Sequence, residues 1–297
     1  MTRSTAGLGG LLRGLMPEAV RARTSPRLKA RVRAILGIEP WPDLAVRHPL
    51  FRSAEYRSLR EAARVFDAPR PNKPVLERGY QTSFLLARWF KAADVRSAFH
   101  VGYADGRHIF YLSRAGIRCG GTDLPPDDTT WVRIPDGSLD EGTRSRLLRT
   151  DFFRLTVPGI RSVMGAGAVD VLFSEATFET LLPWRVAGVS VPAYGEMDPA
   201  ERRSLMHERF PEKLEELAGD LRNMLFIEPE PSAGGAGSVF EACARRLGSF
   251  AYGVWAFRAP FDQLFRLSPG HPTRQVVYAF TRDAGLLEPL REYAVRQ

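Results

Sequence analysis

The clearest chemical pattern in the sequence lies between residues 97 and 123. Gly102 and Gly106 follow a short apolar segment, and a helix-like stretch begins directly after them. Glycines at a strand-to-helix turn let a ligand approach the backbone closely, and the N–H groups at the start of the helix favour an anionic group such as a carboxylate. Asp123, about twenty residues further on at the end of the next predicted strand, can accept hydrogen bonds from two ribose hydroxyls. The pattern predicts a binding site for a nucleoside.

Two further residues have side chains that could take part in proton transfer. Glu175 follows an apolar segment at 169–174, and His207 lies in a helical stretch that precedes another such segment. A carboxylate or an imidazole can act as a general base when a reacting group must lose a proton. Structural roles are also open, because Glu175 could stabilise a helix N-terminus and His207 could be a solvated surface residue.

No metal site is predicted. Asp127 and Asp128 are adjacent carboxylates, but no histidine or further carboxylate stands at a convincing ligand spacing from them. The only cysteines, Cys119 and Cys243, lie in apolar segments and support neither a disulfide framework nor a cysteine metal site. We expect a cytoplasmic protein without a transmembrane segment.

The elements that must position these residues alternate along the chain. Hydrophobic patterning predicts strands at 97–101, 117–122, 146–150, 169–174, 223–228, 250–257 and 275–281, with helices at 107–115, 201–221 and 238–247. Such alternation is typical of a mostly parallel sheet covered by helices on both faces. The last two strands are separated by a segment without a convincing long helix, so we expect them to form an antiparallel hairpin.

The N-terminal part is predicted to be a helical extension, residues 1–79. One helix opens at Ser53 or Ala54, and a second, from about Tyr80 to Ala92, leads into the first strand. Residues 80–297 form the main domain, with an insert or lid around 181–210. Residues 1–40 form a basic arm with eight Arg or Lys against two Glu, in a chain of net charge +8. Such an arm could touch nucleic acid or an anionic membrane, but a solvated or packed arm is the simpler interpretation, and we expect no nucleic-acid partner.

Over roughly residues 80 to 283 the chain resembles the class I S-adenosylmethionine (SAM)-dependent methyltransferases. The first motif of that family runs acidic residue, any residue, Gly-x-Gly-x-Gly, followed by a helix, a strand and a ribose-binding acid. The residues that fall on this spacing are Gly102, Gly106, Gly116, Gly121 and Asp123. The resemblance implies SAM as the cofactor and an α/β fold: a Rossmann-like seven-stranded, mostly parallel sheet with an antiparallel C-terminal hairpin and a helical N-terminal extension.

The resemblance also implies which residues bind the cofactor. Asp151 would lie at the adenine amino group with Phe152 beside the ring, and Ser174 and Glu175 would emerge at the cofactor edge. Tyr80 would close over the cofactor or be buried in the core. The full predicted set is Tyr80, His100, Gly102, Tyr103, Ala104, Gly106, Asp123, Leu124, Asp151, Phe152 and Ser174.

Two residues depart from the family motif. His100 replaces the acidic residue, and Ala104 replaces the middle glycine. The methyl group of Ala104 narrows the approach to the turn, and His100 changes the charge beneath it. A nicotinamide-dependent Rossmann protein stays open as an alternative, because the same geometry serves both ligands.

These patterns predict a methyltransferase that acts on an O or N atom of a small molecule, of the sugar or secondary-metabolite type, and that could be a homodimer. Methyl transfer is an in-line displacement, so it needs a base only when the acceptor must be deprotonated. Two alternatives remain: a non-catalytic member of the fold that binds SAM, S-adenosylhomocysteine or a partner without turnover, and a methyltransferase for RNA or protein that uses the basic arm.

Overall fold

The computed structural model describes residues 48–67, 77–123, 134–150, 152–175, 185–186, 189–190, 205–229, 236–265 and 275–297. Several predicted features lie outside the described residues. They are the basic arm at 1–40, Leu124, Asp151, the pair Asp127 and Asp128, and most of the insert at 181–210. Within that insert, β5 (Arg185–Val186) and β6 (Val189–Ser190) form a short antiparallel pair.

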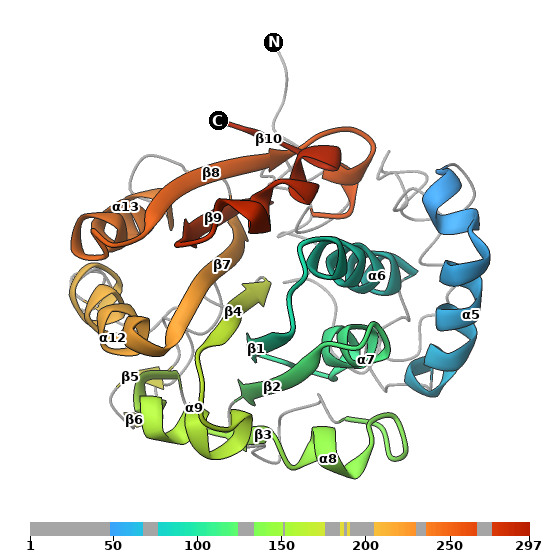
Figure 1. Cartoon of the computed structure of the whole chain (residues 1–297), viewed down its shortest axis with the longest axis horizontal. Helices are drawn as coiled ribbons and strands as arrows, with labels where there is room; N and C mark the ends of the chain where they lie inside the picture. Colours follow the sequence, from blue (N-terminus) through green and yellow to red (C-terminus); the bar gives the residue numbers. More distant parts are fainter. Residues whose placement is uncertain are drawn as a thin grey trace, which may run out of the picture.

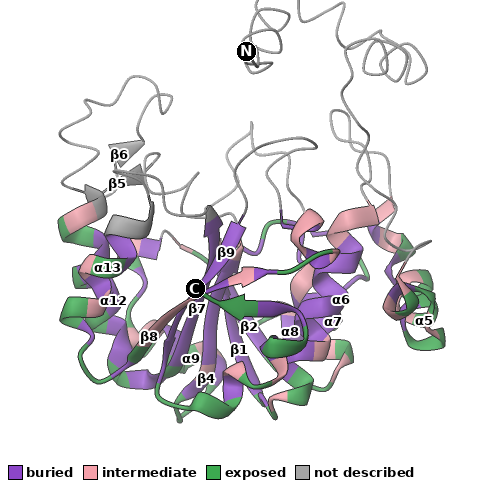
Figure 2. Ribbon diagram, turned by 90° about the horizontal axis from the view of Figure 1, so that it is seen from above, coloured by how far each residue is buried: buried purple, intermediate pink, exposed green. Residues whose placement is uncertain are grey.

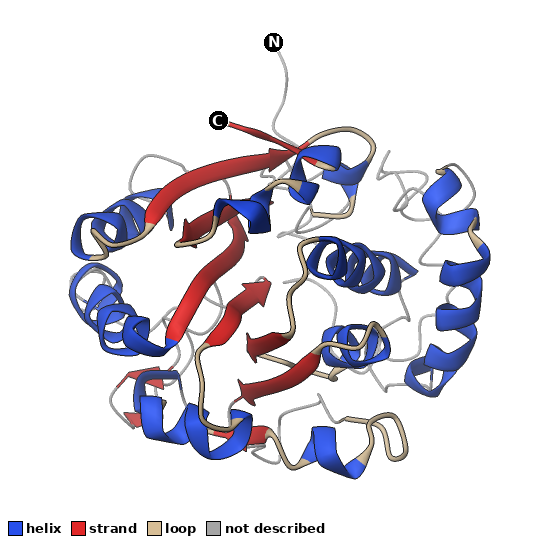
Figure 3. Cartoon of the chain, viewed as in Figure 1, coloured by secondary structure: helices blue, strands red, loops and turns tan. Residues whose placement is uncertain are grey.

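Eight strands form one sheet in the order β10-β8-β9-β7-β4-β1-β2-β3. Figure 3 draws the strands in red and the helices in blue. Five of the strands, β3, β2, β1, β4 and β7, are parallel. Of the other three, β9 runs antiparallel to β7, β8 to β9, and β10 to β8. The predicted mostly parallel sheet and the C-terminal hairpin are therefore confirmed, and β10 is an eighth strand that was not predicted. The strands are β1 (Ser97–Val101), β2 (Arg118–Asp123), β3 (Leu147–Arg149), β4 (Val169–Glu175), β7 (Leu221–Pro229), β8 (Ala251–Phe257), β9 (Gln275–Thr281) and β10 (Ala294–Arg296).

Helices cover both faces of the sheet (Figure 1). One face carries α6 (Glu77–Ala92) and α7 (Arg107–Arg114), and the other carries α9 (Val157–Met164), α12 (Phe210–Leu217) and α13 (Ala236–Arg246). The short α8 (Glu141–Arg144) precedes β3. Strands are buried between helices whose outer surfaces are exposed (Figure 2). The sheet therefore has a hydrophobic core on each side.

The alternation of side chains along the strands divides residues between the two cores. On β1, Ala98 packs with α6 and α7, whereas Phe99 and Val101 pack with the helices of the other face. On β4, Phe173 belongs to the α6 and α7 side and Leu172 to the other. The position of a residue along its strand therefore decides which face of the sheet its side chain lies on, including at the end of the strand.

Helix α5 (Ala54–Ala62), the first α-helix among the described residues, packs against α6. Ser53 is its N-cap, and its side chain accepts a hydrogen bond from the Tyr56 backbone N–H at 3.1 Å. The ring of Tyr56 lies 5.1 Å from that of Phe84 on α6. Short helical turns, η1 (Pro49–Arg52) and η2 (Ala63–Asp67), flank α5. The predicted helix start at Ser53 or Ala54 is confirmed.

Helix α6 begins at Glu77, three residues earlier than predicted. The boundary that we predict between residues 79 and 80 falls inside this helix and stays a prediction. Further short turns are η3 (Phe152–Arg154), the π-helical η4 (Leu205–Arg209), η5 (Ala218–Asp220), η6 (Phe261–Gln263), η7 (Ala284–Leu287) and η8 (Pro289–Glu292). Among the described residues, no helix has the length and apolar character that crossing a membrane requires.

Candidate functional site

The turn between β1 and α7, residues 102–106, is built on three left-handed backbone positions. Gly102, Ala104 and Gly106 have φ values of 73°, 50° and 80°. Glycine adopts such values without strain, but an L-residue in the left-handed region costs roughly 1–2 kcal/mol. The turn is closed by two hydrogen bonds of 2.8 Å, from the Gly102 N–H to Thr122 O and from the Gly106 N–H to Tyr103 O. Ala104 therefore keeps the conformation that glycine would adopt at this place.

The carboxylate of Asp123 lies against this turn. Asp123 is the last residue of β2, and its Oδ2 accepts a hydrogen bond from the Ala104 N–H at 2.6 Å. Because β1 and β2 are parallel neighbours, the turn after β1 and the end of β2 meet at the same edge of the sheet. The strand-turn-helix segment and the acid that the sequence pairs with it are thus in direct contact.

His100 lies beneath the turn as a buried aromatic residue. Its side chain stacks on Phe173, with ring centroids 4.3 Å apart and ring planes at 3°, and only 2% of the residue is exposed. Neither ring nitrogen has a hydrogen-bond partner among the described residues. Burial, and to a lesser extent the charge of nearby His108, lower the pKa of His100 well below its ordinary 6.5. His100 is therefore neutral at pH 7 and adds no positive charge under the turn.

Glu175 is held by a histidine that sequence reasoning did not single out. His108, the second residue of α7, places its Nε2 2.7 Å from Glu175 Oε2, and its Nδ1 lies 2.9 Å from Ser83 Oγ on α6. The Ser83 hydroxyl donates to Gly79 O at 2.7 Å, so its oxygen accepts from His108 Nδ1–H. Ser83, His108 and Glu175 form one hydrogen-bonded row at the edge of the sheet where β1 and β4 end.

The row keeps Glu175 ionised. Burial by itself would raise the pKa of Glu175, but the hydrogen bond from His108, then the charges of His108, Arg78 and Arg107, hold it below the ordinary value. A carboxylate with a lowered pKa is a weak proton acceptor, but it stays ionised and can still accept hydrogen bonds. The catalytic role that the sequence predicts for Glu175 stays a prediction, and the geometry favours binding over proton removal.

The pH dependence of stability tests this ion pair. Replacing Glu175 by glutamine should lower the free energy of unfolding by about 2 kcal/mol at pH 7, because it removes a charged, half-buried hydrogen-bond acceptor. The folded-state pKa of Glu175 is lower than its ordinary 4.5, so its contribution is present above that value and lost as the pH falls through the folded pKa. The difference in the free energy of unfolding between wild type and Glu175→Gln, measured by urea unfolding, should therefore become smaller below pH 4.5. The control is Glu241→Gln, at an exposed residue of α13. A difference in unfolding free energy between wild type and Glu175→Gln that stays constant down to pH 3 would contradict the ion pair between His108 and Glu175.

The remaining predicted residues divide between the two faces of the sheet. Tyr80 is fully buried in α6, where its hydroxyl donates to Asp67 at 2.6 Å, and Tyr103 is buried within the turn. On the other face, Phe152 is buried 5.7 Å from the ring of Phe210. Ser174, also on that side, donates to Glu228 at 3.4 Å.

His207 is not part of the row formed by Ser83, His108 and Glu175. It lies half-buried in η4, directly before α12, on the face of the sheet opposite to α7. Its predicted catalytic role stays a prediction. Among the described residues, no three His, Cys, Asp or Glu side chains cluster as metal ligands would.

A topological signal for His108 exists, although spacing along the chain does not provide it. His108 follows β1 by a short turn, and Glu175 ends β4, which pairs with β1 in parallel. The carboxyl ends of adjacent parallel strands meet at one edge, where α/β proteins bind ligands. Once the order of β1 and β4 is known, the two side chains are expected to be neighbours.

No protein-family model matches the chain, and no curated protein matches it. Solved structures do. The O-methyltransferase TomG from Streptomyces achromogenes, involved in tomaymycin synthesis and solved with SAM, is 13% identical, with 82% of this chain and 97% of that chain covered and a TM-score of 0.44. An O-methyltransferase from Bacillus cereus, solved with S-adenosylhomocysteine, is 11% identical, with 76% and 91% covered and a TM-score of 0.43. The N-methyltransferase NodS from Bradyrhizobium japonicum is 13% identical, with 69% and 94% covered and a TM-score of 0.38.

At such low identity, and with TM-scores below 0.5, these similarities carry no conclusion by themselves. The fold follows instead from the order of the strands. β3, β2, β1, β4 and β7 run parallel, and the reversed β9 lies between β7 and β8. The turn at 102–106 and Asp123 lie at the carboxyl edge of the first two strands, as the motif requires. The chain has the Rossmann-like fold of the class I SAM-dependent methyltransferases.

Proposed function

We propose that the chain binds SAM at the turn 102–106 and transfers its methyl group to an O or N atom of a small molecule of the sugar or secondary-metabolite type. The hydrogen bond from the Ala104 N–H to Asp123 is the observation that supports this most directly. It joins a strand-turn-helix segment to a carboxylate at the end of the next strand, the pairing that nucleoside recognition in such folds requires.

The residues of the turn fit such a cofactor. Gly102 and Gly106 have positive φ and carry no side chain, so the backbone at these two positions of the turn is open to a close approach. Backbone N–H groups at the start of α7 suit the carboxylate of an amino acid, and Asp123 suits the hydroxyls of a ribose. Asp151 and Phe152 are proposed for the adenine on the resemblance alone.

SAM, when bound, would supply a methyl group activated by a sulfonium. The chain's own residues then have to hold the acceptor atom in line with that group and keep water away. Glu175, ionised and fixed by His108, would orient an acceptor N–H or O–H by accepting a hydrogen bond from it. We propose no proton transfer to Glu175, because its pKa is lowered.

Calorimetric titration of the purified chain with S-adenosylhomocysteine and with SAM tests the binding. We expect saturable heat for both ligands, with dissociation constants well below about 1 mM. NADH serves as the comparison ligand, because a nicotinamide-binding protein would respond to it instead. Saturation by NADH together with no response to S-adenosylhomocysteine at millimolar concentration would overturn the proposal.

A second candidate is a non-catalytic protein that binds the cofactor without turnover. The observation that favours it is the set of departures at the turn: neutral, buried His100 and the left-handed Ala104. Incubation with SAM and a panel of amine and hydroxyl acceptors, followed by mass spectrometry of the products, separates the two. A methylated product supports the enzyme, and tight S-adenosylhomocysteine binding without any product across the panel supports the second candidate.

Changing Ala104 to glycine should leave the fold intact and strengthen ligand binding a few-fold. The change relieves the left-handed strain of roughly 1–2 kcal/mol, offset in part by the greater freedom of glycine in the unfolded chain, so stability should change by at most about 1 kcal/mol. Ala104→Val is the opposing variant, because a β-branched residue is strongly disfavoured at positive φ and should weaken binding and stability together. Calorimetry and thermal unfolding provide both readouts. Equal affinity for the wild type and both variants would show that this position does not face the ligand.

A further inference from the structure

We propose that the N-terminal helix α5 belongs to the binding machinery: Arg60 is a positioning residue that, through Tyr80 and Arg107, holds Asp105 and the turn 102–106 in the conformation that binds ligand. The ligand part of this inference rests on the proposed function, whereas the coupling between α5 and the turn does not. Four consecutive contacts carry it.

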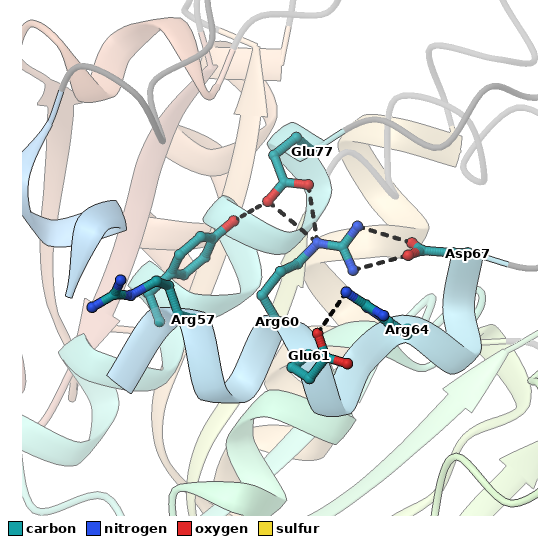
Figure 4. A pocket seen from close by; sticks show the side chains of 7 residues that line it. Arg57, Arg60, Glu61, Arg64, Asp67 and Glu77 are labelled. Carbon is teal, nitrogen blue, oxygen red and sulfur yellow. Dashed lines mark hydrogen bonds and ion pairs between the residues drawn. The ribbon is translucent and has the colours of Figure 1, made fainter. Parts of the chain in front are cut away.

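The first contact fixes Arg60 itself. Its guanidinium forms two hydrogen bonds with Asp67, of 3.0 and 3.1 Å, and its Nε lies 3.0 Å from Glu77 Oε2 on α6. Glu77 also accepts a hydrogen bond from the Tyr56 hydroxyl. These residues line a surface pocket of about 740 Å³ between α5 and α6, in which the Arg60 fork lies between the two carboxylates (Figure 4). A guanidinium held by two carboxylates has one orientation, which a lysine in its place would not reproduce.

The second contact passes from Arg60 to Tyr80. The Arg60 Cζ lies 3.8 Å from the centroid of the Tyr80 ring, within the range of a cation–π interaction. The Tyr80 hydroxyl donates to Asp67, the same carboxylate that binds Arg60. Tyr80 has no exposed surface, so its ring is fixed by both its face and its hydroxyl.

The third contact places Arg107 on α6. The Arg107 Cζ lies 5.1 Å from the same ring centroid. Gly79 provides the space for it, because a Cβ at that position would overlap the Arg107 guanidinium. The side chain of Arg107, the first residue of α7, therefore packs against α6 in the space that Gly79 leaves beside Tyr80.

The fourth contact reaches the turn. Arg107 Nε lies 2.7 Å from Asp105 Oδ2, and the Arg107 backbone N–H donates to Asp105 Oδ1 at 3.1 Å. Asp105 is only 5% exposed and lies between the left-handed residues Ala104 and Gly106. The peptide planes of the turn are thus linked to the position of Arg107, and the Ala104 N–H that binds Asp123 belongs to the adjoining residue.

Two variants weaken the contacts between Arg60 and Asp105 at different points without removing a core side chain. Arg60→Lys keeps the charge but loses the planar fork. Gly79→Ala displaces only the end of the flexible Arg107 side chain, and alanine favours the helix more than glycine does. Arg64→Ala is the control, since Arg64 lies four residues after Arg60, in η2, is 70% exposed at its side chain, and is paired with Glu61.

Hydrogen exchange of the ligand-free protein, followed by mass spectrometry, is the decisive measurement. Amides of residues 102–108 should exchange about tenfold faster in Arg60→Lys and in Gly79→Ala, with α9 unchanged as the internal reference. In the double variant these amides should exchange no faster than about twice the rate in either single variant, because both changes interrupt the same series of contacts from Arg60 to Asp105. Wild-type exchange at 102–108 in either variant, faster exchange in Arg64→Ala, or multiplying effects in the double variant would overturn the proposal.

Affinity provides the second readout. The dissociation constant for S-adenosylhomocysteine should rise about tenfold in each single variant, with the same lack of additivity, while the melting temperature changes little. If wild-type protein binds no S-adenosylhomocysteine but the exchange results hold, the proposed function fails and the coupling stands. If the ligand binds but exchange and affinity ignore Arg60 and Gly79, the coupling fails and the proposed function stands.

Discussion

Replacing Asp123 by alanine should weaken S-adenosylhomocysteine binding by about 100-fold or more. The carboxylate accepts the Ala104 N–H at 2.6 Å and, in the proposed complex, would also accept from the ribose hydroxyls. Each hydrogen bond to a charged group contributes about 1.5–3 kcal/mol, so losing the carboxylate removes both the ribose contact and the restraint on the turn. Calorimetric titration measures the change directly.

The control is Asp136→Ala, a carboxylate whose side chain is 89% exposed and which lies 3.8 Å from Arg144. It should bind S-adenosylhomocysteine as the wild type does. Asp123→Asn is an intermediate case, since the amide keeps one acceptor but loses the charge. Its affinity for S-adenosylhomocysteine should lie between those of Asp123→Ala and Asp136→Ala. An Asp123→Ala protein with wild-type affinity would remove the basis of the proposed cofactor site.

Replacing Gly121 by alanine should lower the free energy of unfolding by about 3 kcal/mol. Gly121 lies in β2 opposite His100 of β1, and a Cβ there would approach the backbone oxygen of His100 to 2.6 Å and Tyr103 Cδ1 to 3.1 Å. A backbone oxygen in a sheet cannot turn away as the end of a long side chain can, so β1 and β2 would have to separate. Because the turn 102–106 follows β1 directly, ligand binding should be lost together with stability.

Gly219→Ala is the matched control, because nothing lies within 4 Å of a Cβ built on this residue. It should be neutral or stabilise the protein by up to about 1 kcal/mol through the unfolded chain. Urea unfolding of the two variants side by side measures the difference. A Gly121→Ala protein as stable as Gly219→Ala would mean that the two strands tolerate a wider spacing than the structure indicates.

Much of the sheet could be predicted from the sequence, since local patterns are enough to define a strand. The first two strands and the final hairpin follow from apolar runs bounded by glycine and charged residues, and the structure confirms them. Among the elements that differ from the prediction are β10, α9 and the start of α6. β10 has only three residues, too few to show an alternation. The first turn of α6 was missed because Gly79, a poor helix former, weakens the helical pattern there.

The candidate site was predictable only in its local part. Gly102 to Gly106 and Asp123 are linked by a fixed spacing that follows from one strand, one helix and the next strand. The pairing of His108 with Glu175 spans 67 residues, and it depends on β4 lying beside β1 rather than elsewhere in the sheet. The contact of the Arg107 side chain with Tyr80 and Gly79 depends in the same way on how α6 packs against α7. Neither contact leaves a pattern in the order of the residues.

The outermost strands of the sheet have a consequence for the protein in concentrated solution. Both outermost strands, β10 and β3, have three residues each. Unpaired N–H and C=O groups on a long, flat edge strand can pair with a strand of another chain, as happens in fibrils. A very short edge strand has few such groups to pair. Of the large hydrophobic side chains in the described part of the protein, the exposed one is Val295, which lies on β10 between Ala294 and the charged Arg296. Self-association through strand addition is thus disfavoured at both ends of the sheet.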